Sequence, residues 1–145
     1  MFKRILLPTD GSEQSERAIQ AGVGFAKELG AEVVGLAAMP EFHTFTLNAD
    51  MLEDSKQQFA VHAQQQAEQH LRYIVEAGAA AGVPCTCELV TSDDPHDAII
   101  ATARKRQCDL VVMASHGRKG IKGVLLGSET QKVLVNSSIP VLVFR

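Results

Sequence analysis

Short apolar segments alternate along this chain with longer segments of helical periodicity, and the alternation restricts the fold more than any other feature. The apolar segments are short, and several are apolar on both alternating faces, as expected for strands that are covered on both sides. The segments between them repeat apolar residues every three or four positions, which is typical of amphipathic helices. Strands are therefore expected at residues 5–7, 33–39, 85–90, 110–113 and 141–144, and helices at 12–30, 51–80, 98–106 and 128–135.

The order of these elements predicts the fold class. Strands and helices that alternate from one end to the other favour an α/β fold, an open, doubly wound five-stranded parallel sheet with helices on both faces. A length of 145 residues is that of one domain, so a single domain is expected over residues 1–145. In such sheets ligands bind beyond the carboxyl ends of the strands, where the strand order reverses. The loops after Leu7 and Met113 are therefore the first places to look for a binding site.

Composition excludes several functional classes. The 14 Lys and Arg residues against 17 Asp and Glu residues give a net charge of -3, without the strong cationic field of a nucleic-acid binder. No apolar stretch approaches the roughly 18 residues that span a bilayer, and the first apolar run is too short for a secretory signal. Three cysteines cannot all pair within one chain, which favours a reducing compartment. We therefore expect a cytoplasmic protein that binds neither nucleic acid nor membrane.

The loop after the fourth expected strand has the composition of a phosphate site. Residues 114–128 contain four glycines, three cations and a serine at the start of a helix. Such a loop allows close backbone approach, offers unpaired N–H groups and supplies positive charge. A flexible loop whose glycines serve turns explains the same composition equally well. The loop is neither a Walker A motif nor a G-x-G-x-x-G fingerprint, and the chain has no G-x-S-x-G nucleophile elbow.

Over nearly its whole length the chain resembles the universal stress proteins. Nucleotide-binding members of that family carry G-x2-G-x9-G-[ST] after the fourth strand, and Gly117, nine residues, Gly127 and Ser128 match its second half. Residues 5–12 resemble the first strand and adenine-side loop of the family, residues 108–113 its fourth strand and residues 139–143 its closing strand. The resemblance implies a Rossmann-like fold of the adenine nucleotide alpha hydrolase-like type. It also implies binding of ATP, with Mg²⁺ or Mn²⁺ held through the phosphates.

One position departs from the family motif. The first motif glycine is replaced by Ala114, which adds a methyl group beside the expected ribose and phosphates. A Cβ is tolerated there if the residue has a negative φ and the ligand does not press against it. The resemblance otherwise implies a nucleotide site made of adenine-side residues Pro8, Thr9, Asp10 and Ala38, of Met113 and Ala114 by the ribose, of His116 in the loop, and of Gly117, Gly127, Ser128, Glu129 and Thr130 at the phosphates.

Several of these residues also have simpler explanations. Asp10 suits an Asx turn or a helix cap, and Ser128 suits an N-cap. His116 suits a general base, but a lone loop histidine more often forms a structural hydrogen bond or packs. His62 and His70 are eight residues apart, too far to share one metal ion. No metal site made of protein side chains alone and no catalytic residue is assigned.

Three functions fit these observations. The resemblance implies an ATP-binding regulatory module of the stress response, a homodimer through residues 141–144 that acts on an unidentified partner protein; an uncovered apolar last strand also favours pairing. The second is an enzyme, a slow ATPase or phosphotransferase, with charge from Arg118, Lys119 and Lys122 but no evident base. The third is a nucleotide-free member of the family that works through protein contacts. The replacement of the first motif glycine by Ala114 is the observation that suggests it. At most weak ATP hydrolysis is expected.

Overall fold

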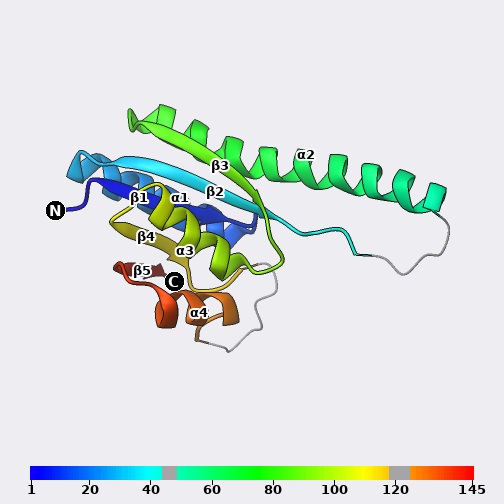
Figure 1. Ribbon diagram of the computed structural model, residues 1–145. Coiled ribbons are helices and arrows are strands. Elements are labelled where there is room, and N and C mark those ends of the chain that lie inside the picture. The colour runs from blue at the N-terminus through cyan, green and yellow to red at the C-terminus, as the bar shows by residue number, and fades with distance from the viewer. Residues whose placement is uncertain (44–48, 118–124) are drawn as a thin grey trace.

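A parallel five-stranded sheet in the order β3-β2-β1-β4-β5 forms the centre of the protein (Figure 1). The computed structural model describes residues 1–43, 49–117 and 125–145, without the side chains of residues 49–52. The predicted open α/β sheet is confirmed, and each neighbouring pair of strands is parallel. The strands are β1 (Arg4–Thr9), β2 (Glu32–Met39), β3 (Cys85–Thr91), β4 (Leu110–Ala114) and β5 (Val141–Phe144).

Two helices cover each face of the sheet. These are α1 (Glu13–Leu29) and α2 (Ala49–Ala81) on one face, and α3 (Pro95–Lys105) and α4 (Ser128–Asn136) on the other. Helix α1 is capped at both ends: the Ser12 hydroxyl accepts a hydrogen bond from the N–H of Ser15 at 3.2 Å, and Gly30 ends the helix with φ 65°.

Successive residues of the strands supply two separate cores. Ile5 and Leu7 of β1 face α1 and α2, where they pack with residues such as Ile19 and Ile74. Leu6 points the other way, toward the core beneath α3 and α4. All five side chains are fully buried. The strands are apolar on both faces because both faces are covered, which is why their sequences show apolar runs rather than alternation.

The first strand is longer than its apolar run predicts. It continues through Pro8 to Thr9, whereas the apolar run predicted a strand at residues 5–7. The ladder between β1 and β4 joins Ile5 and Leu6 to their partners and goes no further, whereas the ladder with β2 continues to Thr9. Pro8 therefore lies where β1 has a neighbour on one side only, and its missing N–H leaves no gap in a two-sided ladder.

Helix α2 extends past the sheet at its first turns (Figure 1). Residues 53–58 are exposed, and the helix becomes buried from Ala67 onward, where it lies over β2 and β3. None of the helices in the described ranges has both the length and the apolar character that crossing a membrane requires.

Candidate functional site

The candidate site lies at the carboxyl ends of β1 and β4, where the strand order reverses. The two strands are paired at Ile5 and Leu6 and then separate, so their ends leave space between them. The loops that follow, after Thr9 and after Ala114, meet across this space. This is the position at which an open α/β sheet binds ligands.

An inner pocket of about 100 Å³ occupies the gap between the strand ends. Most of its wall is apolar, with polar groups from the β1 loop, from α1 and from the start of α4. Nine of the residues implied by the family resemblance line it, and it takes further contacts from Ser15, Leu36, Pro95 and Ile99. The nine are Pro8, Thr9, Asp10, Ala38, Met113, Ala114, His116, Gly117 and Thr130.

The loop after β1 is held by its own side chains. Asp10 Oδ1 accepts a hydrogen bond from the N–H of Ser12 at 2.9 Å, so the Asx turn considered from the sequence is present. Thr9 Oγ1 accepts from the N–H of Gly11 at 3.1 Å and lies 3.2 Å from Ser15 Oγ. These contacts fix the Asp10 carboxyl group at the pocket, so the turn and a ligand role are compatible.

An outer cleft of about 560 Å³ opens beside the inner pocket. The two cavities share Thr9, Asp10, Ala38, Pro95 and Gly117. The remaining three residues of the expected site, Gly127, Ser128 and Glu129, line the outer cleft. It also receives Met39, Pro40, Phe59, His62, Ala63, Gln66, Ala67, His70 and Asp93.

The start of α4 forms one end of the outer cleft. Gly127 is the N-cap residue, with φ -67° and ψ 155°, so the interpretation of Ser128 as the N-cap is wrong and Ser128 is the first helical residue. The first intrahelical hydrogen bond runs from the N–H of Gln131 to the Gly127 carbonyl at 3.0 Å. N–H groups of a first helical turn lack helical partners and favour anions.

The α4 start is tied to β4 by buried hydrogen bonds. The Thr130 hydroxyl, in a side chain that is 3% exposed, lies 3.0 Å from the Ala114 carbonyl and 3.2 Å from the Ser115 carbonyl. The N–H of Gly127 donates to the Ser115 carbonyl at 2.6 Å. The two ends of the loop after β4 are therefore joined, and the glycines at 117 and 127 face the same cavity.

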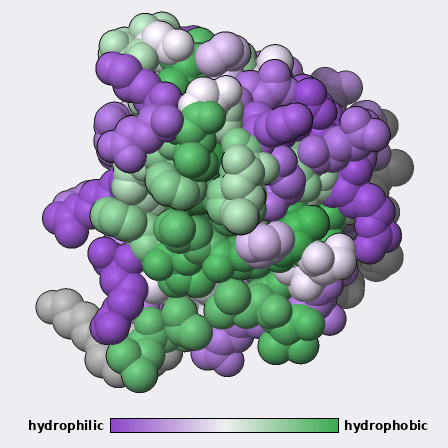
Figure 2. Space-filling model, turned by 90° about the vertical axis from the view of Figure 1, so that its left-hand side faces the viewer, coloured by the Kyte–Doolittle hydropathy of each residue, from purple (hydrophilic) through white to green (hydrophobic). Residues whose placement is uncertain are grey.

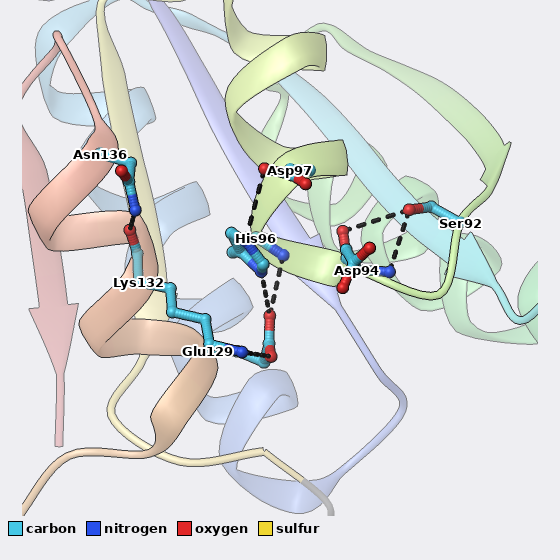
Figure 3. A network of polar contacts seen from close by, with 7 residues as sticks. All are labelled: Ser92, Asp94, His96, Asp97, Glu129, Lys132 and Asn136. Atoms are coloured by element: carbon cyan, nitrogen blue, oxygen red, sulfur yellow. Dashed lines mark hydrogen bonds and ion pairs between the residues drawn. The ribbon is translucent and has the colours of Figure 1, made fainter.

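Glu129 takes part in a polar network between α3 and α4 (Figure 3). Its Oε2 accepts hydrogen bonds from the backbone N–H and from Nδ1 of His96, each at 2.9 Å. Oε1 lies 3.3 Å from Lys132 Nζ, and His96 Nε2 lies 3.3 Å from Asp97 Oδ1. Partial burial raises the pKa of Glu129, but the hydrogen bonds from His96 and Lys132 outweigh it and the pKa is lowered. The Glu129 carboxylate thus joins two helices at the edge of the cleft that this residue lines.

His116 has one satisfied and one orphaned ring nitrogen. Nδ1 lies 3.0 Å from Ser115 Oγ, whereas Nε2 is buried with no hydrogen-bond partner among the described residues. Buried polar atoms are rarely unpaired, and one that borders a pocket indicates a missing ligand or water.

Ala114 meets one condition for tolerating a side chain in place of the motif glycine. It is the last residue of β4, paired with Phe144 of β5, and it is 8% exposed. Gln107 is the non-glycine residue with a positive φ among the described residues. Ala114 therefore has a negative φ, and as a strand residue it has an ordinary extended backbone. The methyl group borders the inner pocket without backbone strain.

Metal-ligating side chains cluster at one place in the described chain. Ligand atoms of Glu41, His43 and Asp93 all lie within 4.8 Å of one another, and the three residues are exposed. A hydrogen bond from His43 to Asp93 raises the pKa of the histidine and lowers that of the carboxyl group. Exposed groups of this kind are common without an ion, so we assign no metal to them.

The cysteines do not form a ligand set. Burial raises the pKa of the Cys85, Cys87 and Cys108 thiols, to about 11 for Cys108. Cys85 and Cys87 pack in the core beneath α2. Buried thiols with raised pKa values are poor nucleophiles and poor ligands.

Sequence reasoning missed the residues that α2 and α3 bring to the site. Pro95 and Ile99 line the inner pocket, and His62 and His70 line the same outer cleft, although the sequence analysis considered the two histidines only as metal ligands. The eight-residue spacing of the histidines places them on one helix face, which was the available signal. Arg118, Lys119 and Lys122, expected to supply charge, lie outside the described residues.

Known proteins resemble this chain in both sequence and structure. A relative from Thermus aquaticus, a universal stress protein, is 31% identical, and the alignment covers all of both chains. A solved structure of MJ0577, a universal stress protein of Methanocaldococcus jannaschii, superposes with a TM-score of 0.83 at 29% identity, over 99% of this chain and 95% of that one.

A third relative was solved with a ligand. It is a universal stress protein in complex with cAMP, with a TM-score of 0.72 and 26% identity over 99% of this chain and 97% of that chain. The sequence also matches the profile of the Universal stress protein family over residues 1–145. The chain therefore belongs to the universal stress protein family.

Proposed function

We propose that this protein binds an adenine nucleotide, with ATP and a divalent ion as the expected ligand, and that the bound state is read by a partner protein in a stress response. One observation carries the proposal: a small, mostly apolar pocket and a larger cleft with a greater share of polar surface adjoin at the reversal of strand order and share five residues. A purine ring needs the first kind of space and a phosphate chain needs the second.

The groups around the two cavities suit the parts of a nucleotide. In the inner pocket Asp10 offers a carboxylate acceptor and His116 an orphaned ring nitrogen. In the outer cleft Gly127 caps α4, whose first-turn amides favour an anion. A Mg²⁺ or Mn²⁺ ion would be held chiefly through phosphate oxygens. The relative that was solved with cAMP is a further support for an adenine nucleotide.

Nucleotide content is the measurement that tests this proposal. The purified protein is denatured, its supernatant is separated by anion exchange, and the nucleotide-free protein is titrated with ATP–Mg²⁺, cAMP and GTP in a calorimeter. Co-purified adenine nucleotide, or an isotherm with ATP or cAMP that GTP does not reproduce, is the expected result. Absence of both would refute nucleotide binding and favour a protein that acts through protein contacts.

Two variants place the ligand. Gly127→Val is expected to abolish binding, because a Cβ at residue 127 would already lie 3.2 Å from the Ser115 carbonyl and the larger side chain would block the loop. Ala114→Gly tests whether the methyl group at this position restricts the ligand. Thermal unfolding of each variant shows that it is folded. ATP incubated with stoichiometric protein for hours reports turnover, and rapid loss of ATP would favour the enzyme.

We also propose that the protein is a homodimer through β5. This strand is an edge of the sheet, and its Leu142 is 40% exposed. In the adjoining helix α4, Leu134 is 40% and Val135 81% exposed. Figure 2 shows apolar surface gathered over the middle and lower part of the side of the molecule that bears the amino ends of the strands. An apolar edge strand of this kind invites pairing.

Sedimentation at micromolar concentration tests the dimer. A dimer is expected for the unmodified protein, and Leu142→Glu is expected to shift it toward monomer because the charge would be buried at the interface. Gln65→Glu, on the exposed side of α2, adds the same charge elsewhere and is expected to leave the dimer intact. A protein that sediments as a monomer throughout this concentration range would contradict the proposal.

A further inference from the structure

One face of α2 forms a wall of the outer cleft. His62, Gln66 and His70 lie at successive intervals of four residues, so their side chains project from the same side of the helix, and all three line the cleft. We call these three residues the histidine face. Ala63 and Ala67 line the cleft beside them, and their small side chains leave room in front of the imidazole rings.

The cleft needs positive charge if it is to hold a phosphate chain. Its described lining contains three carboxyl groups, those of Asp10, Asp93 and Glu129. Among the same described lining residues, His62 and His70 are the side chains that can become cationic. Within the described part of the chain, the compensation for an anionic ligand in this cleft therefore comes from α2 and from the α4 N-terminus.

Two of the three carboxyl groups bind residues that do not line the cleft. Asp93 pairs with His43 and accepts a hydrogen bond from the N–H of Glu41 at 2.9 Å. Glu129 is bound by His96 and Lys132, as Figure 3 shows. These partners offset part of the negative charge of the lining. The imidazole groups of α2 line the same cleft.

On this basis, and resting on the nucleotide function proposed above, we propose that the histidine face of α2 contacts the phosphate chain of the bound nucleotide and selects ligands by the length of that chain. The two histidines lie at different depths. His70 Nε2 lies 2.1 Å from the ideal position of a Cβ on Gly11, so the ring packs against the loop that carries Asp10. His62 lies about two helical turns further out, roughly 12 Å along the axis, and is exposed.

The two depths predict graded recognition. His70, beside the adenine-side loop, is placed to contact the phosphate nearest the ribose. His62, toward the projecting end of α2, is placed to contact the end of a longer chain. Because adenosine has no phosphate, its affinity should not depend on His62.

Charge on the histidines gives the inference a second readout. Imidazole gains a proton as the pH falls from about 8 to about 6, and a hydrogen bond from a charged donor to phosphate is stronger than one from a neutral donor. Three further histidines face the same carboxyl groups or the inner pocket: His43 on Asp93, His96 on Glu129, and His116. A pH profile of the unmodified protein therefore combines several groups, and variants are needed to isolate α2.

The experiment is a set of calorimetric titrations with adenosine, AMP, ADP and ATP–Mg²⁺ at pH 6 and pH 8, on the full chain and on two variants. In His62→Gln we expect ATP to bind roughly tenfold more weakly at pH 6, with adenosine changed less than about twofold. In His70→Gln we expect AMP, ADP and ATP all to weaken. Both variants should lose part of the tightening of ATP binding between pH 8 and pH 6. Gln69→His, which adds an exposed histidine outside the cleft, is the matched control and should change nothing.

The outcomes separate this inference from the function it rests on. If adenosine and all three nucleotides fail to bind the unmodified protein, the proposed function fails. If ATP binds, and His62→Gln and His70→Gln leave its affinity and pH dependence unchanged, the histidine face does not contact the phosphates and the inference is overturned. If His62→Gln weakens adenosine as much as ATP, the residue acts through the fold and the inference is likewise overturned.

Discussion

Replacement of Gly11 by alanine is expected to destabilise the protein by about 2 to 3 kcal/mol. Two costs add. Gly11 has φ 76°, a conformation that costs a residue with a Cβ about 1 to 2 kcal/mol. The new Cβ would also lie 2.1 Å from His70 Nε2 and 2.4 Å from Cδ2, so the imidazole must move. Overpacking of this kind typically costs about 1 to 3 kcal/mol, and the lower end applies because the ring ends a side chain that can rotate.

Two other glycines separate the costs. Gly30 has φ 65° with no atom within 4 Å of its ideal Cβ, so Gly30→Ala should show the backbone cost alone, about 1 kcal/mol. Gly24, within α1, has neither a positive φ nor a close neighbour, and Gly24→Ala should stabilise the helix by up to about 1 kcal/mol.

Urea unfolding followed by circular dichroism measures these changes as shifts of the midpoint at constant slope. A double-mutant cycle of Gly11→Ala with His70→Ala isolates the steric part, and the two changes should be coupled by about 1 kcal/mol because the second removes the ring that the first displaces. If Gly11→Ala costs no more than Gly30→Ala and shows no coupling to His70, the packing of α2 on the Asp10 loop is not as described.

Three further changes test other parts of the site. Thr130→Val removes the hydroxyl donor of two buried carbonyls at the end of β4 and should cost about 1 to 3 kcal/mol in urea unfolding, whereas Thr130→Ser should cost less. Gly117→Ala would place a Cβ 2.4 Å from Asp10 Oδ2 and should weaken nucleotide binding in calorimetry, because the carboxyl group would have to leave its position at the pocket. Glu129→Gln should destabilise the protein at pH 7 and progressively less as the pH falls into the acidic range, measured by urea unfolding across pH. The lowered pKa of Glu129 means that its contribution is present above the unfolded pKa and is lost as the pH falls through the folded pKa.

The fold was predictable because most of its signals are local. The apolar runs around Leu6, Val34 and Val111 are short and bounded by turn residues, and each is a buried strand of the sheet. The limits of strands were less predictable, as Pro8 illustrates. Proline ends a strand with neighbours on both sides, but β1 has lost β4 as a neighbour by that point. Only the three-dimensional pairing reveals this.

The positions of the expected site residues could be predicted from the loops after β1 and β4. The residues that contact them could not. All twelve line one of the two cavities, because the loops after β1 and β4 meet wherever these strands are neighbours. The side chain of Glu129 is bound by His96, 33 residues earlier, a contact that depends on how α3 and α4 pack. The histidine face was missed for the same reason. The periodicity of α2 shows that His62 and His70 share a face, but not which side of the molecule that face meets.

The separation of β1 from β4 explains why these features occur together. Where the ladder ends after Leu6, the sheet gives up inter-strand hydrogen bonds and opens the inner pocket. Backbone groups released there are satisfied locally: Thr9 and Asp10 bind amides of the loop after β1, and Thr130 binds carbonyls at the end of β4. Because these contacts come from side chains and not from the sheet, the pocket can persist without a ligand to fill it. Among buried side-chain nitrogen and oxygen atoms of the described residues, Nε2 of His116 is the one without a hydrogen-bond partner, and it borders the same pocket, so it is the group that the proposed ligand would satisfy.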